Sequence, residues 1–140
     1  MATLVAYYSY TGHSRALAQR LASEESADTA EIKDVKRPLK LKAYTAGCLA
    51  AMRGKPWAIQ PLESDLAGYD RIVLFAPVWA NNPAPAINAF VAQLPKGKAV
   101  SVKMVSASGK SNCKDRLEAA IKSKGCSLDG FEDINSRNIK

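Results

Sequence analysis

The chain alternates short apolar segments with longer amphipathic ones, a pattern typical of strands followed by helices. Residues 4–8 are apolar, aromatic and β-branched, which predicts a strand buried on both faces. From Arg15 onward the apolar positions recur at helical spacing, with Leu17 and Leu21 one turn apart. The first strand is therefore expected to enter a helix through residues 9–14, a turn rich in hydroxyl groups.

The same two patterns continue to the end of the chain. They predict further strands at residues 29–35, 71–76, 99–105 and, more weakly, 126–134, and further helices at residues 43–52, 84–94 and 112–123. We expect the strand at 71–76 to stop at Pro77, because proline has no N–H to donate. Strands that alternate with helices predict a parallel sheet with right-handed crossovers and helices on both faces. At 140 residues, the chain is expected to form a single domain spanning residues 1–140.

The turn at residues 9–14 is a candidate anion site. The first N–H groups of a helix lack partners within the helix and lie at the positive end of its dipole, so they can bind a phosphate. Ser9, Thr11 and Ser14 add hydroxyl donors, and Gly12 allows the backbone to approach a ligand closely. The alternative is that Ser9 or Thr11 only caps the helix. The turn has neither G-x-x-x-x-G-K-[ST] nor G-x-G-x-x-G, which argues against a nucleoside triphosphate or a dinucleotide.

The composition narrows the classes of function. Lys and Arg number 20 against 13 Asp and Glu, which gives a net charge of +7. Such a charge favours anionic ligands, acidic protein partners or non-specific nucleic acid, or it serves only solubility. The basic residues form no long run and no stripe interleaved with aromatic residues, so dedicated nucleic-acid binding is not indicated. No apolar segment is long enough to span a membrane.

The three cysteines are far apart in the sequence and are accompanied by a single histidine. We therefore expect reduced thiols, no metal site and a cytoplasmic protein. Cys113 lies near the start of a predicted helix, where a thiolate would be favoured. With no base close to it in the sequence, we assign it no catalytic role.

Two separated motifs resemble the flavodoxin family. Residues 9–14 read SYTGHS and match its [ST]-x-T-G-x-[ST] phosphate loop, and residues 77–85 read PVWANNPAP and resemble its second flavin loop. The resemblance extends from Leu4 to about Gly109. It implies a flavodoxin-like, doubly wound α/β fold with a five-stranded parallel sheet in the order 2-1-3-4-5. Since no helical pattern precedes Lys140, the last helix of that fold is expected to be absent.

The resemblance also implies a non-covalently bound FMN. Its 5′-phosphate would be held by the first loop, which comprises Ser9, Tyr10, Thr11, Gly12, His13 and Ser14. Its ring would lie between a second loop, Pro77, Val78, Trp79, Ala80, Asn81 and Asn82, and a third, Ser106, Ala107, Ser108 and Gly109. Trp79 would pack on the ring because an indole offers a large flat apolar surface, or it is an ordinary, partly buried tryptophan. Tyr44, Met52 and Trp57 either line the same cleft or fill the core.

Three features depart from the pattern of electron carriers in this family. Carriers are typically acidic, whereas this chain is basic. The third loop has no aromatic residue, so one face of the flavin is expected to be open to a substrate. Without a last helix, the sheet edge is expected to be bare or covered by a second copy in a homodimer.

Three hypotheses follow. The first is an FMN-binding redox protein that mediates electron transfer with a partner protein. The second is an NAD(P)H-dependent FMN oxidoreductase that reduces a quinone or a similar small acceptor. The third is a flavin-free binding or regulatory module on the same fold. No constellation of acid, base and nucleophile stands out, which agrees with chemistry that belongs to a cofactor.

Overall fold

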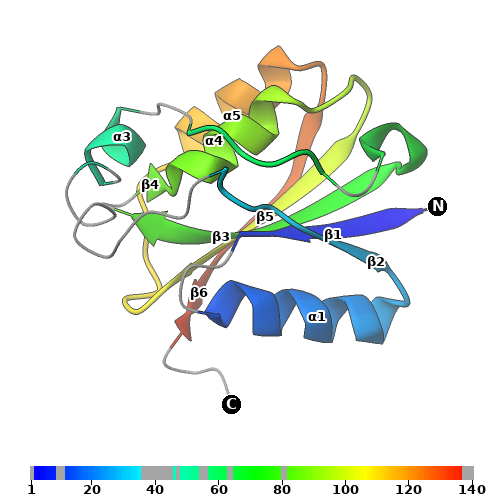
Figure 1. Cartoon of the computed structure of the whole chain (residues 1–140), viewed down its shortest axis with the longest axis horizontal. Helices are drawn as coiled ribbons and strands as arrows, with labels where there is room; N and C mark the ends of the chain where they lie inside the picture. Colours follow the sequence, from blue (N-terminus) through cyan, green and yellow to red (C-terminus); the bar gives the residue numbers. More distant parts are fainter. Residues whose placement is uncertain are drawn as a thin grey trace.

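The computed structural model describes residues 2–8, 12–35, 46, 48–53, 57–62, 65–79 and 82–136. Its centre is a sheet whose strands lie side by side in the order β2, β1, β3, β5, β6 (Figure 1). Every neighbouring pair along this path is parallel. The strands are β1 (Thr3–Tyr7), β2 (Asp28–Glu31), β3 (Arg71–Trp79), β5 (Ala99–Ser106) and β6 (Ser127–Asn135). The predicted α/β fold with a parallel sheet is therefore confirmed.

The sheet has a sixth strand that the sequence analysis did not predict. β4 (Asn82–Pro83) runs antiparallel to the end of β3 and pairs with Val78 and Trp79. The predicted number of five strands is thus wrong, although the five parallel strands follow each other in the expected spatial order. The cause is the length of β1, which ends opposite Phe75 and leaves the last residues of β3 with an open edge. β4 pairs with this edge.

β3 also continues beyond the proline at which it was predicted to stop. The N–H and C=O groups of one strand residue point to the same side, and Pro77 O accepts a hydrogen bond from Ala84 N at 3.2 Å on the side of β4. The missing N–H of Pro77 therefore lies on the side that β1 has already left. The parallel ladder on the other side is unaffected and includes the pair of Pro77 with Val105.

Helices cover both faces of the sheet (Figure 1). α1 (His13–Glu25) packs on one face, where alternate strand residues such as Val5 and Phe75 meet its buried alanines. α4 (Pro85–Ala92) and α5 (Lys114–Ser123) pack on the other face, where the intervening strand residues meet Phe90 and Ile121. Because side chains in a strand point alternately to the two faces, residues 4–8 are buried on both, as predicted.

Several predicted elements have different bounds. β2 ends at Glu31, and Asp34 instead forms an isolated antiparallel bridge with Ile59. The helix predicted at 43–52 corresponds to α3 (Cys48–Met52), and residues 43–45 and 47 lie outside the described part. A 3-10 turn, η2 (Leu66–Gly68), precedes β3. The described residues end one position after β6, so the expected absence of a last helix stays a prediction.

Candidate functional site

The three predicted loops all follow the carboxyl-terminal end of the parallel sheet. β1, β3 and β5 are neighbouring parallel strands, so their carboxyl ends lie side by side. Each of the three loops follows one of these ends. The structure describes Gly12, His13 and Ser14 of the first loop, Pro77, Val78, Trp79 and Asn82 of the second, and all of the third. Ser9, Tyr10, Thr11, Ala80 and Asn81 lie outside the described residues.

The start of α1 has features that suit a bound anion. Gly12 is the N-cap residue and has a φ of 101°, a left-handed conformation that L-residues rarely adopt. A Cβ built at Gly12 would meet no heavy atom of the described residues within 4 Å, so these residues leave space beside it. The first turn of the helix contains His13 and Arg15 and no acidic residue. A negative group at this helix terminus would be favoured by the helix dipole.

Arg15 joins the first turn of α1 to the end of β2. Its Nη2 atom lies 2.8 Å from Oε2 of Glu31, and Tyr7 donates a longer hydrogen bond, 3.5 Å, to the other carboxylate oxygen. Burial raises the pKa of Tyr7, and Glu31 raises it further, while Arg15 opposes both. Glu31 also raises the pKa of Arg15. At neutral pH the Tyr7 phenol is therefore neutral and the Arg15 guanidinium is charged. Both contact Glu31, and through Arg15 this contact connects the start of α1 with β2.

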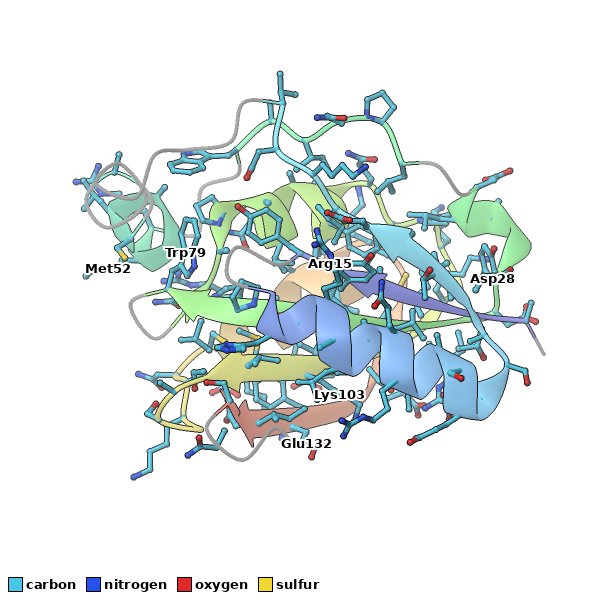
Figure 2. The ribbon with its side chains drawn as sticks, turned by 60° about the horizontal axis from the view of Figure 1, so that its bottom comes forward. Arg15, Asp28, Met52, Trp79, Lys103 and Glu132 are labelled. Carbon is cyan, nitrogen blue, oxygen red and sulfur yellow. The ribbon has the colours of Figure 1, made fainter. Side chains whose placement is uncertain are left out.

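Trp79 ends β3 and contacts two other aromatic rings. Its ring centroid is 6.2 Å from that of Tyr8 and 6.1 Å from that of Trp57, and both pairs are edge-to-face. Trp79 and Trp57 are half-buried, whereas Tyr8 is buried. Trp57 therefore lies beside the second loop. From the sequence alone, it could either line the cleft or fill the core. Met52 is exposed at the same end of the molecule (Figure 2), and Tyr44 lies outside the described residues.

Tyr8 also anchors the chain segment that carries Trp57. Its hydroxyl donates a hydrogen bond of 2.5 Å to Oδ2 of the buried Asp34. The backbone around Asp34 is in turn bonded to the segment after Trp57, through Val35 N to Ala58 O at 3.1 Å and Gln60 N to Lys33 O at 2.7 Å. From the sequence, Tyr8 is expected only to end the strand at residues 4–8. Its position directly before the first loop is the signal in the sequence that could have placed its side chain near the candidate site.

Replacing Tyr8 with phenylalanine is expected to lower the free energy of unfolding by about 1 kcal/mol, because Asp34 loses a buried donor. The ring contact with Trp79 should persist, since phenylalanine keeps the aromatic ring. Urea denaturation followed by circular dichroism measures the loss. Tyr69→Phe is a suitable control, because the Tyr69 hydroxyl also donates to a carboxylate, Asp28, but at an exposed position. Equal losses for the two variants would contradict the prediction.

The third loop forms a compact turn around one hydroxyl group. Ser106 Oγ accepts hydrogen bonds from Gly109 N at 3.0 Å and from Lys110 N at 3.2 Å. Gly109 has a φ of 70°, and a Cβ at this position would lie 3.0 Å from the Cβ of Asn135. The loop therefore packs closely on the end of β6. Its hydroxyl groups serve the turn itself, and it presents no aromatic ring toward the second loop.

The environment of Cys113 is the reverse of that expected from its place before α5. The side chain is buried, and burial raises the pKa of its thiol. A hydrogen bond with Ser111 and the charge of Arg116 lower the pKa, and Asp133 raises it, but the combined result is an increase. The expected favouring of a thiolate is therefore wrong, because loss of solvation outweighs the helix terminus. Within the described part of the chain, no cluster of His, Cys, Asp and Glu could hold a metal ion.

We expect the three free cysteines to react with Ellman's reagent at different rates. Cys48 is half-buried, whereas Cys113 and Cys126 are buried, so Cys48 should react first. In the native protein at pH 7.5 the fast phase should correspond to about one thiol, because thiolate character and access both control the rate. The Cys48→Ser variant should lose this phase. A fast phase that persists in this variant would show that a buried thiol is accessible.

Comparisons with known proteins support the assignment of the fold. No protein-family model and no curated protein matches the sequence. Among solved structures, a Bacteroides eggerthii protein provisionally described as a flavoprotein has a TM-score of 0.79 at 21% identity, covering 96% of this chain and 88% of its own. A Lactobacillus acidophilus flavoprotein in complex with FMN has a TM-score of 0.68 at 23% identity, covering 93% and 91%. Oxidised flavodoxin 2 from Bacillus cereus has a TM-score of 0.59 at 15% identity, covering 100% and 88%.

The helices of the described residues also bear on membrane insertion. None of them is long and apolar enough to cross a membrane.

The arrangement of a parallel sheet with helices on both of its faces is thus shared with these flavoproteins over nearly the whole chain. The predicted resemblance is confirmed, and the chain has the flavodoxin-like fold.

Proposed function

We propose that the chain binds FMN non-covalently and functions as a flavodoxin-like redox protein that mediates electron transfer. The observation that carries this proposal is that the carboxyl ends of β1, β3 and β5 lie side by side, each followed by one of the three loops, and that the first turn of α1 itself contains no acidic residue. Ligands of such sheets bind beyond the carboxyl ends of the strands. The Lactobacillus acidophilus structure, a flavoprotein in complex with FMN, adds support for this cofactor.

The residues present suit an FMN molecule. The first loop would hold the 5′-phosphate, with Gly12 leaving space for it and the backbone N–H groups at the start of α1 pointing toward it. The half-buried indole of Trp79 would pack on the isoalloxazine ring, because it offers a flat apolar surface at the end of β3. FMN would supply the electron chemistry, while these residues would fix its position and its electrostatic environment.

A second candidate function is an NAD(P)H-dependent oxidoreductase that acts on a quinone or a similar small acceptor. The third loop favours this alternative, since it has no aromatic ring and its hydroxyls are engaged within the turn. One face of the flavin would then be open to a substrate. As a carrier, the chain would instead meet a redox partner protein, and its net charge of +7 would favour an acidic one.

Two further expectations from the sequence stay predictions. They are that the protein is located in the cytoplasm and that it forms a homodimer.

The first experiment is the visible absorption spectrum of the purified full chain before and after addition of FMN. Flavin bands with one FMN per chain, confirmed by release and identification of the ligand, are the expected result. A colourless protein that takes up no FMN would contradict the proposal and favour a flavin-free binding module on the same fold.

Oxidation of NADH and NADPH by the FMN-loaded protein then separates the two redox functions. Turnover with a quinone in the absence of any partner protein would support the enzyme. No turnover, together with reversible reduction by a chemical reductant, would support the carrier.

A further inference from the structure

The net positive charge of the chain arises from one stretch of its sequence. Residues 35–56 contain six Lys and Arg and no Asp or Glu. The whole chain has 20 Lys and Arg and 13 Asp and Glu, so the remaining residues carry 14 against 13 and have a net charge of +1. An ion pair between this stretch and another part of the chain would move the excess of positive charge but could not remove it. The excess therefore belongs almost wholly to residues 35–56.

The same stretch carries the large apolar side chains that are exposed. Among the described residues these are Val35, Leu49 and Met52, with exposed fractions of 62%, 48% and 54%. Leu49 and Met52 belong to α3 and are three residues apart, so they lie on one side of the helix. The smaller Cys48 and Ala50 of α3 are half-buried. α3 thus exposes its larger apolar side chains more than its smaller ones, the reverse of an ordinary surface helix.

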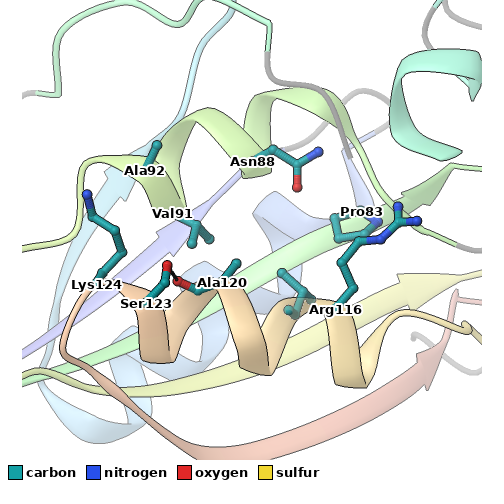
Figure 3. Close-up of a pocket in the computed structure, with 9 residues that line it drawn as sticks. Pro83, Asn88, Val91, Ala92, Arg116, Ala120, Ser123 and Lys124 are labelled. Atoms are coloured by element: carbon teal, nitrogen blue, oxygen red, sulfur yellow. Dashed lines mark hydrogen bonds between the residues drawn. The ribbon is translucent and has the colours of Figure 1, made fainter. Parts of the chain in front are cut away.

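The end of α3 is held in place through its backbone. Figure 3 shows the Arg116 side chain extending from α5 toward Pro83 of β4. Its Nη1 atom donates to Met52 O at 2.9 Å and to Asn82 Oδ1 at 3.2 Å, which joins the last residue of α3 to β4 and α5. Because the contact is made with the carbonyl group of Met52, it does not require burial of the Met52 side chain. The fold therefore fixes α3 while its larger apolar side chains stay exposed.

A cation lies directly beside these apolar side chains. Arg53 follows Met52 and is exposed, and its backbone N–H donates to Leu49 O at 3.2 Å. Its side chain forms no ion pair with any residue that the structure describes. Leu49, Met52 and Arg53 are together called the α3 surface. This surface combines an apolar centre with positive charge and is complementary to an apolar side chain among carboxylates.

We propose that the α3 surface docks an acidic partner protein that presents an apolar side chain surrounded by carboxylates. The apolar side chain would pack on Leu49 and Met52, and the carboxylates would meet Arg53 and the excess of positive charge in residues 35–56. A methionine suits such a surface because its flexible side chain adapts to the shape of a partner. The surface is small, so the complex is expected to be weak, transient and strongly dependent on salt.

The composition of the α3 surface favours a protein over a membrane or a nucleic acid. Surfaces that enter a membrane interface usually expose Trp or Phe beside their basic residues, and surfaces that bind single-stranded nucleic acid stack bases on aromatic rings. None of the described Trp, Phe and Tyr residues is exposed. Trp57, the aromatic residue that follows α3, is half-buried and contacts Trp79.

The α3 surface lies at the end of the molecule that carries the candidate site, where Figure 2 labels both Met52 and Trp79. Met52 and Asn82 of the second loop also accept hydrogen bonds from the same guanidinium, that of Arg116. A docked partner would therefore lie beside the second loop. Exchange of electrons between this partner and FMN rests on the proposed function, whereas the docking itself does not.

The test uses a synthetic peptide with two leucines between two pairs of glutamates. It is titrated into the isotopically labelled full chain at low salt, with and without FMN, and the backbone amide signals are followed by NMR. Saturable shifts at Leu49, Met52 and Arg53 are expected in both cases. Because docking is measured without FMN as well, its failure and the failure of FMN binding are recognised separately.

Three variants distinguish docking from general attraction. The double variant Leu49→Gln, Met52→Gln should weaken the peptide's affinity about tenfold through loss of the apolar contact. Its stability to urea should be unchanged, because both side chains are exposed. Arg53→Gln should weaken the affinity about threefold. Lys96→Gln removes an equal charge from an exposed residue in the turn before β5, at the opposite end of that strand from the third loop, and should have no effect.

Four outcomes would overturn the proposal. Three concern the peptide: no saturable shift, equal weakening by Arg53→Gln and Lys96→Gln, and equal binding of a peptide with lysines in place of the glutamates. For the fourth, the variants are measured with phosphatidylserine vesicles and with a single-stranded oligonucleotide. If the α3 variants lose binding to either of these but keep their affinity for the peptide, the surface serves a membrane or a nucleic acid instead.

Discussion

Replacing Trp79 with alanine is expected to weaken FMN binding about 30-fold, equivalent to about 2 kcal/mol of lost stacking and burial. The indole stands at the carboxyl end of β3, within the second loop, and it makes edge-to-face contacts with the rings of Tyr8 and Trp57. These contacts restrict its rotation before the ligand arrives. The entropy cost of ordering the side chain is then small, so most of the stacking energy should appear as affinity.

The measurement is a titration of each variant with FMN, monitored by quenching of flavin fluorescence. Trp79→Phe retains a smaller flat ring and should lose less affinity than Trp79→Ala. Trp57→Ala is the matched control, because it removes an equal indole that contacts Trp79 but belongs to a different segment. Its effect should be several-fold smaller. If Trp79→Ala binds FMN as tightly as the native chain, Trp79 is an ordinary, partly buried tryptophan and the ring lies elsewhere.

The parts of the fold that the sequence predicts are those with strong local patterns. The apolar runs of β1, β3 and β5 and the helical spacing in α4 and α5 identify these elements without any knowledge of their neighbours. β4 could not be found in this way. It has two residues, one of them Pro83, and it exists because β1 is too short to pair with the whole of β3. β4 thus depends on how far β1 and β3 overlap, and a local sequence pattern does not indicate the register between two strands.

In the candidate site, too, the sequence predicts the features that depend on local patterns and misses those that depend on contacts between distant residues. Its loops follow predicted strands, so their meeting at one edge is deducible once the strands are taken to be parallel and adjacent. The bond from Tyr8 to Asp34 and the packing of Trp57 on Trp79 join residues that are distant in sequence. The pKa of Cys113 depends on burial by the rest of the fold, and for that reason the expectation from its helix position alone had the wrong sign.

Replacing Gly12 with alanine is expected to lower both the stability of the chain and its affinity for FMN. The φ of 101° is the cause, because a Cβ in this conformation approaches the residue's own backbone and costs about 1–2 kcal/mol. Among the described residues, a Cβ at this position would meet no heavy atom within 4 Å, so none of them adds steric crowding. If the backbone relaxes to a negative φ, the N–H groups at the start of α1 turn away from the phosphate, and affinity should fall about tenfold or more.

Gly97 provides a closely matched control. It also has a positive φ, 81°, and a Cβ there would likewise meet nothing within 4 Å, but it lies in the turn before β5, at the opposite end of that strand from the third loop. Gly97→Ala should therefore cost a similar amount of stability and leave FMN affinity unchanged. Urea denaturation and FMN titration of both variants separate the two effects. Equal losses of affinity would mean that binding responds only to global stability, and the start of α1 would then not be the phosphate site.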